Sequence, residues 1–518
     1  MKRKYRHFLL LIALAVLTAA GFYGRVYFCS PDIENFKPVL RPAAIDPDYA
    51  DIVLPPNIAP LNFLIKEKGT EFLVRIYADK GEEIKIVGKK SKIIIPPKKW
   101  RQLLNANRGS KLFFDVYVRD EQDSWNKYQT ITNIISRECI DECIVYRLIK
   151  PVYNLLNNVG IYQRNLTNYD ESVVLKGKSF SYNGCVNCHA FLNNSPDKML
   201  LSVRSGKYGT TTIFKDGKTV NKIGTKFGYA TWHPSGKLAV YSINKLDLLF
   251  RSARPETRDV ADLDSAMLYY LVDTNVVATN PAIADVNHLE TYPAWSPDGK
   301  YLYFCSAPNI WGEQGKTPPD NYEKVKYDLM RISYDVDNDQ WGQLETVLSV
   351  DKTGLSILLP RISPDGKYLL FCMCDYGSFP IYQQDSDLYM MDLKTAEYEK
   401  LDINSDYSES WHSWSSNSRW IAFSSKRQGG LFTRTYISYV DKSGKAHKPF
   451  VLPQKDPLFY DSFLKTYSVP ELITAPIDVS ERMLARAVRS SDEIKVVLPI
   501  TGATPKATGD TQGYVPRE

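Results

Sequence analysis

Residues 293–305 read Pro-Ala-Trp-Ser-Pro-Asp-Gly-Lys-Tyr-Leu-Tyr-Phe-Cys, and the stretches 230–242, 360–372 and 412–424 align with them without gaps. Each copy has an apolar residue ahead of the turn, then Pro-Asp-Gly or a relative, then a strand that ends in an aromatic and a small residue. Proline presets φ, aspartate bonds its own backbone and glycine accepts a positive φ. Each copy therefore predicts a β-hairpin.

The hairpins recur at a spacing that predicts a larger unit. Their apolar positions lie 63, 67 and 52 residues apart, at Trp232, Trp295, Ile362 and Trp414. Each gap holds a second strand pair, with strands such as 328–334 or 387–393. Four strands per repeated unit are typical of a β-propeller blade. The repeats leave the blade count open between five and six.

The same register assigns roles to lesser residues. Cys305 and Cys372 hold the small-residue position, where neighbouring blades pack closely, so we interpret them as packing residues. Asp298 and Asp365 are turn formers in this reading rather than catalytic acids.

Residues 185–189 read Cys-Val-Asn-Cys-His, the spelling of a covalent c-type haem site. The thiols of Cys185 and Cys188 would add to the two vinyl groups of one haem c, and His189 would be the proximal ligand of the iron. With the cysteine and histidine content of this chain, only about 0.001 copies of the motif are expected by chance. A Cys185–Cys188 disulfide beside an unrelated histidine, or a zinc half-site, remain as alternatives; zinc would want a second Cys/His pair.

A fifth, weaker copy of the repeat follows the motif. Residues 195–204 match the turn and strand of the other copies with one residue deleted at the glycine. This alignment predicts that the motif lies on a loop at one rim of the first blade. His189 lies six residues before Ser195, and in the later repeats that offset falls at Glu290 and Glu409.

The sixth ligand of the iron is left open by the sequence. Met199 is near in the chain, whereas His288 and His412 share the side of His189 in the repeat register. We predict that His288 or His412 reaches the distal side of the haem, with Met199 as the alternative. His233 lies in a turn at the other end of its strand and is not expected to do so.

These repeats resemble the PD40 (WD40-like) repeats of the TolB-type six-bladed β-propeller, with residues 292–300 carrying the likeness. The chain as a whole resembles a group of Bacteroidota cell-envelope proteins that combine an N-terminal anchor, a β-rich region, the Cys-Val-Asn-Cys-His stretch and such repeats. The resemblance implies a TolB-like propeller over roughly residues 180–455. The haem motif and the anchor depart from TolB itself, so a Tol–Pal role is not implied.

The N-terminus predicts export. Lys2, Arg3, Lys4 and Arg6 precede an apolar run over 8–22, which is typical of a secretory signal peptide or an uncleaved signal anchor. We favour the anchor, which would tether the protein to the inner membrane and place all later residues in the periplasm.

The remaining patterns predict an all-β chain. We expect a signal peptide or anchor at 1–30, a Pro-rich tether at 31–60 and an immunoglobulin-like β-sandwich at 61–148 with a short helix at 98–105. A connector at 149–180 is expected to lead to the propeller at 181–460. The last segment, 461–518, is expected to close the propeller, to contain a helix at 481–489 and to end in a disordered tail. Cys139 and Cys143 either close a small disulfide loop or are buried thiols.

Two functional hypotheses follow. The first is a periplasmic, membrane-tethered haem c protein for electron transfer or redox sensing, with an unidentified redox partner. The second is a propeller scaffold that binds an envelope protein or polymer, with the cysteine motif structural. A propeller hydrolase has least support, because the chain has no Gly-x-Ser-x-Gly elbow. The net charge of +6 comes mostly from the N-terminal basic residues, so nucleic acid is not an expected partner.

Overall fold

The computed structural model describes residues 33, 35–150, 159–250, 256–311 and 321–497. They form two compact units. The first consists of the described parts of Met1–Asp51, Pro60–Ile135 and Lys455–Leu458, and the second of those of Ile52–Ala59, Ser136–Gln454 and Phe459–Glu518. The predicted anchor at 1–30 lies outside the described residues. Within the ranges given above, no helix has the length and apolar character needed to cross a membrane.

The first unit is built on a mixed sheet. Its order is β1-β9-β8-β10, β5 pairs with the other edge of β8, and β6 pairs with β5; β1 runs parallel to β9. A small sheet has the order β2-β4-β7. The elements are β1 (Lys37–Pro42), β2 (Ile45–Asp46), β4 (Phe63–Ile65), β5 (Glu71–Tyr77), β6 (Ile84–Gly88), β7 (Lys92–Ile93), α2 (Pro97–Ala106), β8 (Lys111–Arg119), β9 (Trp125–Gln129) and β10 (Ile131–Ile135).

The core of this unit joins its sheets and its helix. Phe63 of β4 stacks on Phe114 of β8 with ring centroids 5.9 Å apart, and Trp100 of α2 meets Phe114 edge-on at 6.4 Å. All three side chains are buried. The predicted short helix at 98–105 is thus confirmed, with apolar residues of one face turned to the core.

Two expectations for this region differ from the structure. The described part of the predicted tether at 31–60 is not an extended linker, because β1 begins at Lys37 and Tyr49 is fully buried. The immunoglobulin-like sandwich is not what the strands show, since the second sheet has strands of two or three residues and the larger sheet contains a parallel pair. Residues 136–148 belong to the other unit.

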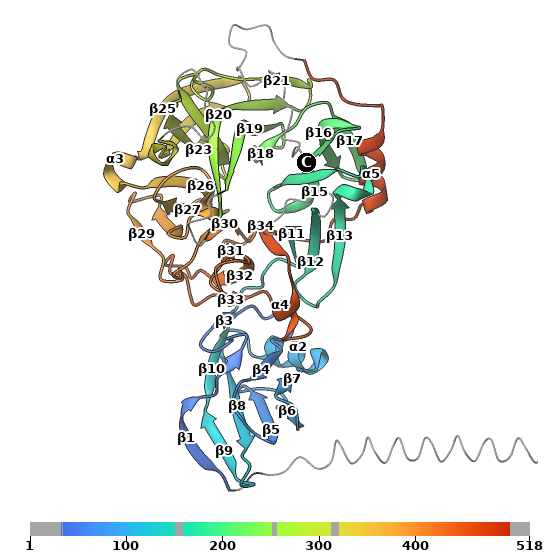
Figure 1. Cartoon of the computed structure of the whole chain (residues 1–518), viewed down its shortest axis with the longest axis vertical. Coiled ribbons are helices and arrows are strands. Elements are labelled where there is room, and N and C mark those ends of the chain that lie inside the picture. The colour runs from blue at the N-terminus through green and yellow to red at the C-terminus, as the bar shows by residue number, and fades with distance from the viewer. Residues whose placement is uncertain (1–32, 34, 151–158, 251–255, 312–320, 498–518) are drawn as a thin grey trace, which may run out of the picture. The chain divides into compact units, whose positions relative to one another are not determined.

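The second unit contains six four-stranded sheets arranged as the blades of a propeller (Figure 1). The blades are β34-β11-β12-β13, β14–β17, β18–β21, β22–β25, β26–β29 and β30–β33. In each blade the first strand of this order lies innermost, and innermost strands of successive blades contact one another. The predicted propeller is therefore confirmed, with six sheets.

The strands of this unit are β3 (Val53–Leu54), β11 (Cys143–Ile149), β12 (Gly160–Asn165), β13 (Glu171–Lys176), β14 (Cys185–Leu192), β15 (Ser195–Ser205), β16 (Gly209–Asp216), β17 (Thr219–Ile223), β18 (Gly228–Trp232), β19 (Leu238–Phe250), β20 (Arg258–Leu271), β21 (Val276–Ala278), β22 (His288–Trp295), β23 (Tyr301–Pro308), β24 (Asp328–Asp335), β25 (Gln340–Leu348), β26 (Ser356–Ile362), β27 (Tyr368–Cys374), β28 (Asp387–Asp392), β29 (Tyr398–Lys400), β30 (Glu409–Trp414), β31 (Trp420–Ser425), β32 (Arg434–Tyr439), β33 (Phe450–Val451) and β34 (Thr466–Ile473). Its helices are α3 (Val350–Thr353), α4 (Phe459–Ser462) and α5 (Glu481–Arg489), the last as predicted.

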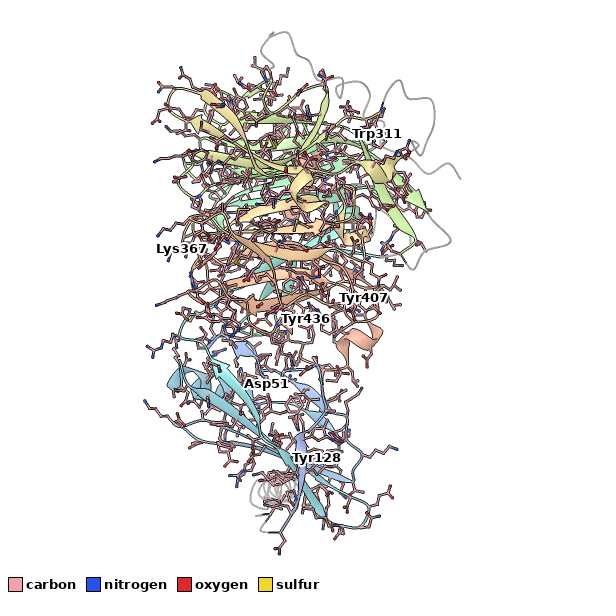
Figure 2. All side chains as sticks on the ribbon, turned by 90° about the vertical axis from the view of Figure 1, so that its left-hand side faces the viewer. Asp51, Tyr128, Trp311, Lys367, Tyr407 and Tyr436 are labelled. Atoms are coloured by element: carbon pink, nitrogen blue, oxygen red, sulfur yellow. The ribbon has the colours of Figure 1, made fainter. Side chains whose placement is uncertain are left out.

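The hydrophobic core lies in layers between blades. One cluster joins the closing blade (β34-β11-β12-β13) to β15, β16 and α5, and the next three join successive blades up to β26–β29. Seen from the side, side chains fill the space between the strands of neighbouring blades (Figure 2). Each blade is thus sandwiched between two others and buries both faces.

The ring is closed by strands far apart in the sequence. β34 pairs antiparallel with β11, with Cys143 opposite Ile473 and Ile149 opposite Thr466. The segment 149–180, expected to be a connector, therefore supplies strands of a blade. No turn signature predicts this blade, because β11 to β13 carry no Pro-Asp-Gly turn.

The hairpin turns of the repeats have the predicted backbone. Gly236, Gly299 and Gly366 have φ of 71°, 73° and 72°, the left-handed conformation that glycine accepts most readily. Asp298 accepts hydrogen bonds from the Ser296 hydroxyl and the Lys300 N–H, which confirms it as a turn former.

The predicted alignment of the fifth repeat copy is wrong. The first hairpin of β14–β17 turns at Asn193 and Asn194, whose φ values of 49° and 59° are typical of a type I′ turn. Ser195 already begins β15. The Ser-Pro-Asp stretch therefore lies in a strand and does not mark the turn.

Every innermost strand contains a β-bulge at the same place. In β18, β22, β26, β30 and β34 the bulge holds a residue with positive φ, namely Tyr229, Tyr292, Leu359, Trp411 and Val469. β14 has the bulge, at Asn187 and Cys188, without the left-handed residue. The bulges give the innermost strands a common register.

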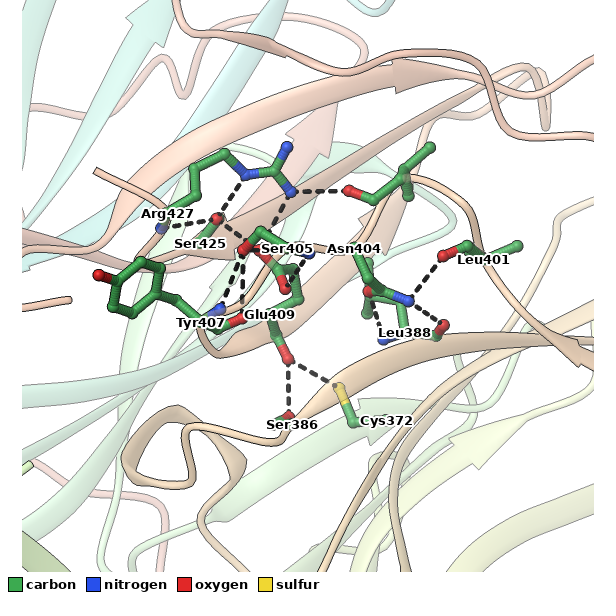
Figure 3. A network of polar contacts seen from close by, with 11 residues as sticks. Cys372, Ser386, Leu388, Leu401, Asn404, Ser405, Tyr407, Glu409, Ser425 and Arg427 are labelled. Carbon is green, nitrogen blue, oxygen red and sulfur yellow. Dashed lines mark hydrogen bonds and ion pairs between the residues drawn. The ribbon is translucent and has the colours of Figure 1, made fainter. Parts of the chain in front are cut away.

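A buried ion pair stands at the start of β30 (Figure 3). Glu409 is fully buried; its Oε1 accepts hydrogen bonds from Arg427 Nη2 at 3.0 Å and from the Ser405 and Ser425 hydroxyls at 2.7 Å. The Cys372 thiol contacts the Glu409 carbonyl oxygen at 3.7 Å. Cys372 is fully buried, and burial raises its pKa, which agrees with a packing role.

Closure by β34 is the first feature to test. A chain that ends after Phe463 leaves the edge of β11 unpaired and loses the buried side chains of Tyr467, Leu472 and Ile473. Those three alone are worth roughly 5–9 kcal/mol, comparable with the net stability of a domain. We expect this chain to aggregate in size-exclusion chromatography. A chain that ends after Val497 retains every described pairing and should melt as the full chain does; equal melting of the two truncations would contradict closure by β34.

The Glu409 network predicts a large effect of an isosteric change. Glu409→Gln keeps the shape but leaves the Arg427 guanidinium without its buried counter-charge, so we expect the free energy of unfolding to fall by about 3 kcal/mol. Glu345→Gln removes a half-exposed partner of Arg331 and should cost no more than about 0.5 kcal/mol. Calorimetric melting of both variants measures the difference, and equal melting temperatures would show that the pair is not a stabilising contact.

Candidate haem segment and the inner ring of the propeller

The predicted haem motif lies on β14, the innermost strand of its blade, and not on a loop at the rim. Cys185 begins the strand, Cys188 lies in the bulge and His189 follows it. The position matters because a strand sends alternate side chains to opposite faces. A helical turn would bring the three groups to one side, and a strand does not.

The cross-strand register shows which face each side chain takes. Val186 is opposite Val203 and His189 is opposite Leu201, and directly opposed residues share a face. Val186, Val203 and Leu201 all belong to the core cluster shared with the closing blade. Cys185, next to Val186, is opposite Arg204 and therefore lies on the other face, toward β18–β21. His189 and Cys185 thus lie on opposite faces of β14.

The two thiols lie in basic surroundings. Cys185 is buried; its Sγ is 3.5 Å from Asn187 Oδ1, and Arg204 Nη2 lies 3.9 Å from the sulfur. Burial lowers the pKa of Lys226, Arg204 lowers it further, and both Cys188 and Cys185 oppose the shift. The thiols are therefore within electrostatic reach of one ammonium group, on the side of the blade that faces β18. Neither cysteine is disulfide-bonded.

His189 is the most isolated polar side chain of the segment. It is 4% exposed, and burial, Arg147 and Arg361 together lower its pKa to about 3. The backbone of Val469 acts in the opposite direction, but neither ring nitrogen completes a hydrogen bond with a described residue. The imidazole is therefore neutral, and both its nitrogens lack partners.

These positions test whether a haem c fits the segment. Covalent attachment needs both thiols on one side of the porphyrin edge and the imidazole beneath the same iron. The thiols of Cys185 and Cys188 meet the first condition, and His189, on the opposite face, does not meet the second. The described backbone of β14 therefore does not hold a haem through all three groups.

The sixth-ligand candidates are placed apart from one another. His288 begins β22 and its Nδ1 lies 3.0 Å from Asp285 Oδ2 at the surface. His412, in the β30 bulge, is buried; its Nε2 lies 3.0 Å from the Leu370 carbonyl oxygen and its Nδ1 3.6 Å from Cys372 Sγ.

Met199 of β15 is fully buried in the cluster shared with the closing blade. It therefore lies on the face of His189 and away from Cys185.

His233 lies in a turn, as expected, and its Nε2 is 3.0 Å from the Gly299 carbonyl oxygen. Of the two alternatives for Cys139 and Cys143, the structure has free thiols and no disulfide loop, with Cys143 buried and Cys139 half-buried.

Sequence reasoning missed an aromatic cluster at the centre of the ring. The bulge residues Tyr229, Tyr292 and Trp411 come from three blades, with centroid distances of 4.6 to 6.0 Å between their rings. The Tyr292 hydroxyl donates to the Ser378 carbonyl oxygen at 2.6 Å. These residues precede the quoted turns by only a few positions, and their common bulge is visible only in the backbone.

Other possible sites lie away from the motif. Within the described ranges, no group of three His, Cys, Asp or Glu residues could hold a metal ion. A shallow surface cavity of about 390 Å³ lies at β24 and β25, lined by residues that include Tyr334 and Trp341, and contains none of the predicted site residues.

The register also relates Cys185 to two buried carboxylates. Counting from the bulge, Glu290 of β22 and Glu409 of β30 stand at the position of Cys185, and not at that of His189 as predicted. Glu409 has the Arg427 guanidinium, whereas the carboxylate of Glu290 accepts the Asp285 N–H at 3.0 Å and has no basic partner among the described side chains. Burial therefore raises the pKa of Glu290 to about 8.

No family model matches the chain and no curated protein matches it. Solved structures that are similar include an oligogalacturonate lyase from Vibrio parahaemolyticus, with 12% identity over 73% of this chain and 100% of that chain and a TM-score of 0.34. The Kuenenia stuttgartiensis hydrazine synthase has 10% identity over 64% of this chain and 46% of that chain, with a TM-score of 0.41. The Dos1 propeller has 14% identity over 52% and 63%, with a TM-score of 0.32. Likeness at this level carries no argument about function.

The buried carboxyl of Glu290 predicts a pH dependence. The folded protein binds its proton up to about pH 8, whereas the unfolded chain releases it near 4.5. Its contribution to stability is therefore complete below pH 4.5 and is lost as the pH rises to 8, on the order of 5 kcal/mol in all. Glu290→Gln should be increasingly more stable than wild type between pH 5 and 8 in thermal melts, whereas Glu345→Gln, on exposed β25, should follow wild type. A constant difference for Glu290→Gln would contradict the shifted pKa.

Proposed function

We propose that this chain is a redox protein of the cell envelope whose centre is built on Cys185 and Cys188. The single observation that supports it is the pair of unbonded thiols on one side of β14, with the Arg204 guanidinium beside Cys185 and the half-buried Lys226 within electrostatic reach of both thiols. Such surroundings suit an attachment or redox site better than inert packing.

The sequence motif specifies covalent haem c as the form of this centre. Cys185 and Cys188 would carry the thioethers, and the haem would supply one-electron transfer or a redox-sensing response. The thiols support this attachment, and His189 does not support axial ligation in the described backbone. No electron path is derived through the haem for that reason. The tether to the inner membrane and the periplasmic location rest on the N-terminal sequence alone.

A second candidate function is a docking scaffold. Exposed large apolar side chains of the propeller gather on the side where the innermost strands begin: Tyr182, Leu246, Phe250, Val286, Ile310, Leu431 and Leu464. Single exposed apolar residues are common, but their concentration on one side favours a protein partner. On this reading the cysteine motif is structural.

Expression with the haem c maturation system decides between the two. We expect haem that survives acid-acetone extraction and a mass increase of one haem per chain. Cys185→Ser with Cys188→Ser should abolish both and leave the propeller folded, because each is a near-isosteric change on an edge strand. Cys139→Ser, a half-buried thiol outside the motif, is the matched control and should keep the haem.

The outcome against haem is also defined. If exported, folded protein carries no haem, reversible oxidation between Cys185 and Cys188 remains as the redox chemistry, and mass spectrometry of the peptide under oxidant and reductant measures it. Absence of both covalent haem and reversible thiol oxidation would refute the redox proposal and leave the scaffold.

A further inference from the structure

Three strands place charged or polar side chains at one level of the inner ring. His189 of β14, Arg361 of β26 and Glu471 of β34 are each the first residue to resume strand pairing after the bulge of its strand, or its equivalent. The common register therefore puts them at the same height in the ring. At the other three equivalent positions stand small residues, namely Thr231, Ala294 and Ser413.

The side chain of Arg147, from β11 of the closing blade, reaches the same height in the ring. Its Nη1 donates to Asn187 Oδ1 at 3.0 Å and its Nη2 to Ser468 Oγ at 3.3 Å, so the guanidinium reaches from β11 past β34 to β14. Both acceptors are neutral. Arg147 Nε is buried and has no hydrogen-bond partner among the described residues. The charge of this guanidinium is therefore not balanced by either of its hydrogen-bond partners.

Arg361 differs in having a counter-charge. Its Nη2 donates to Glu471 Oε1 at 3.1 Å, and the Arg361 side chain remains 34% exposed. The pair leaves one of the two guanidinium charges at this level uncompensated. A buried charge without a partner is costly, and an anion bound beside it would reduce that cost.

The imidazole of His189 is a second polar group at this height whose hydrogen-bonding capacity is not used. His189 is more than nine-tenths buried, and neither of its nitrogens completes a hydrogen bond with a described residue, although the Val469 backbone lies near the ring. It stands two residues after Asn187, which accepts a hydrogen bond from Arg147. A neutral imidazole offers one N–H donor, and an unsatisfied buried donor costs about 1–3 kcal/mol. An acceptor bound between the imidazole and the guanidinium groups would satisfy it.

We propose that Arg147, His189 and Arg361 form a binding site for a small carboxylate anion in the inner ring of the propeller. A carboxylate matches the planar guanidinium fork and carries the single charge that is missing. Its second oxygen accepts from the imidazole N–H. His189 and Cys185 lie on opposite faces of β14, so the site borders the thiol centre only through Asn187, whose Oδ1 contacts both Arg147 and Cys185. It does not depend on the presence of haem.

The test uses the full chain with Cys185→Ser and Cys188→Ser, to which no haem attaches, so its result is independent of the redox proposal. Acetate and succinate are titrated at constant ionic strength, followed by ligand-detected NMR. Arg147→Gln should weaken carboxylate binding at least about tenfold, the size expected for a charge-assisted hydrogen bond. Arg331→Gln, a surface arginine on β24, is the matched control and should leave the affinity within about twofold.

A second variant keeps the test informative if Arg147→Gln fails to fold. Asn187→Asp is nearly isosteric and preserves the acceptor of Arg147, but it supplies the missing negative charge from the protein itself. It should therefore compete with the anion and weaken binding by at least about tenfold. The proposal is wrong if neither carboxylate binds tighter than about 10 mM, if Asn187→Asp binds as its parent does, or if Arg331→Gln loses as much affinity as Arg147→Gln.

Discussion

The pairing of β34 with β11 is the constraint on which the propeller depends. It joins residues 143–149 to residues 466–473, and without it the closing blade would have three strands and the ring would have a free edge. Each blade is stabilised mainly by the layers of side chains between it and its neighbours. A ring lets every blade have two such neighbours, and closure is what turns a row of blades into a ring.

Closure by β34 also explains why polar and charged side chains of different blades lie at the same height in the inner ring. β34 brings Ser468, Val469 and Glu471 into contact range of side chains from β11, β14 and β26. Because all six innermost strands share one bulge, residues from blades distant in sequence meet at defined heights. The aromatic rings of Tyr229, Tyr292 and Trp411 meet at the bulge itself, and the charged residues stand two positions later in the register.

Sequence reasoning predicted what local signals encode. The Pro-Asp-Gly turns, the four-stranded units and the helix at 481–489 follow from backbone preferences of single residues and from short periodicities. The closing blade was missed because its strands carry no turn signature and one of them comes from beyond the repeats. The first hairpin was misaligned because Ser195-Pro-Asp imitates a turn, whereas the turn is made by Asn193 and Asn194.

The haem motif shows the limit of spacing as a structural argument. Cys-x-x-Cys-His brings its groups to one side only when the backbone turns, and spacing alone does not say whether it does. In β14 the strand geometry separates His189 from the two cysteines, and the bulge at Asn187 and Cys188 shifts the alternation without reuniting the three. At the position of His189 the other blades carry a carboxylate, an arginine or small residues, so one backbone position of the inner ring accepts side chains of different chemistry. Function in this propeller therefore follows from which side chain stands at each height of the ring and which face it takes, a property of the strand register that the motif by itself does not contain.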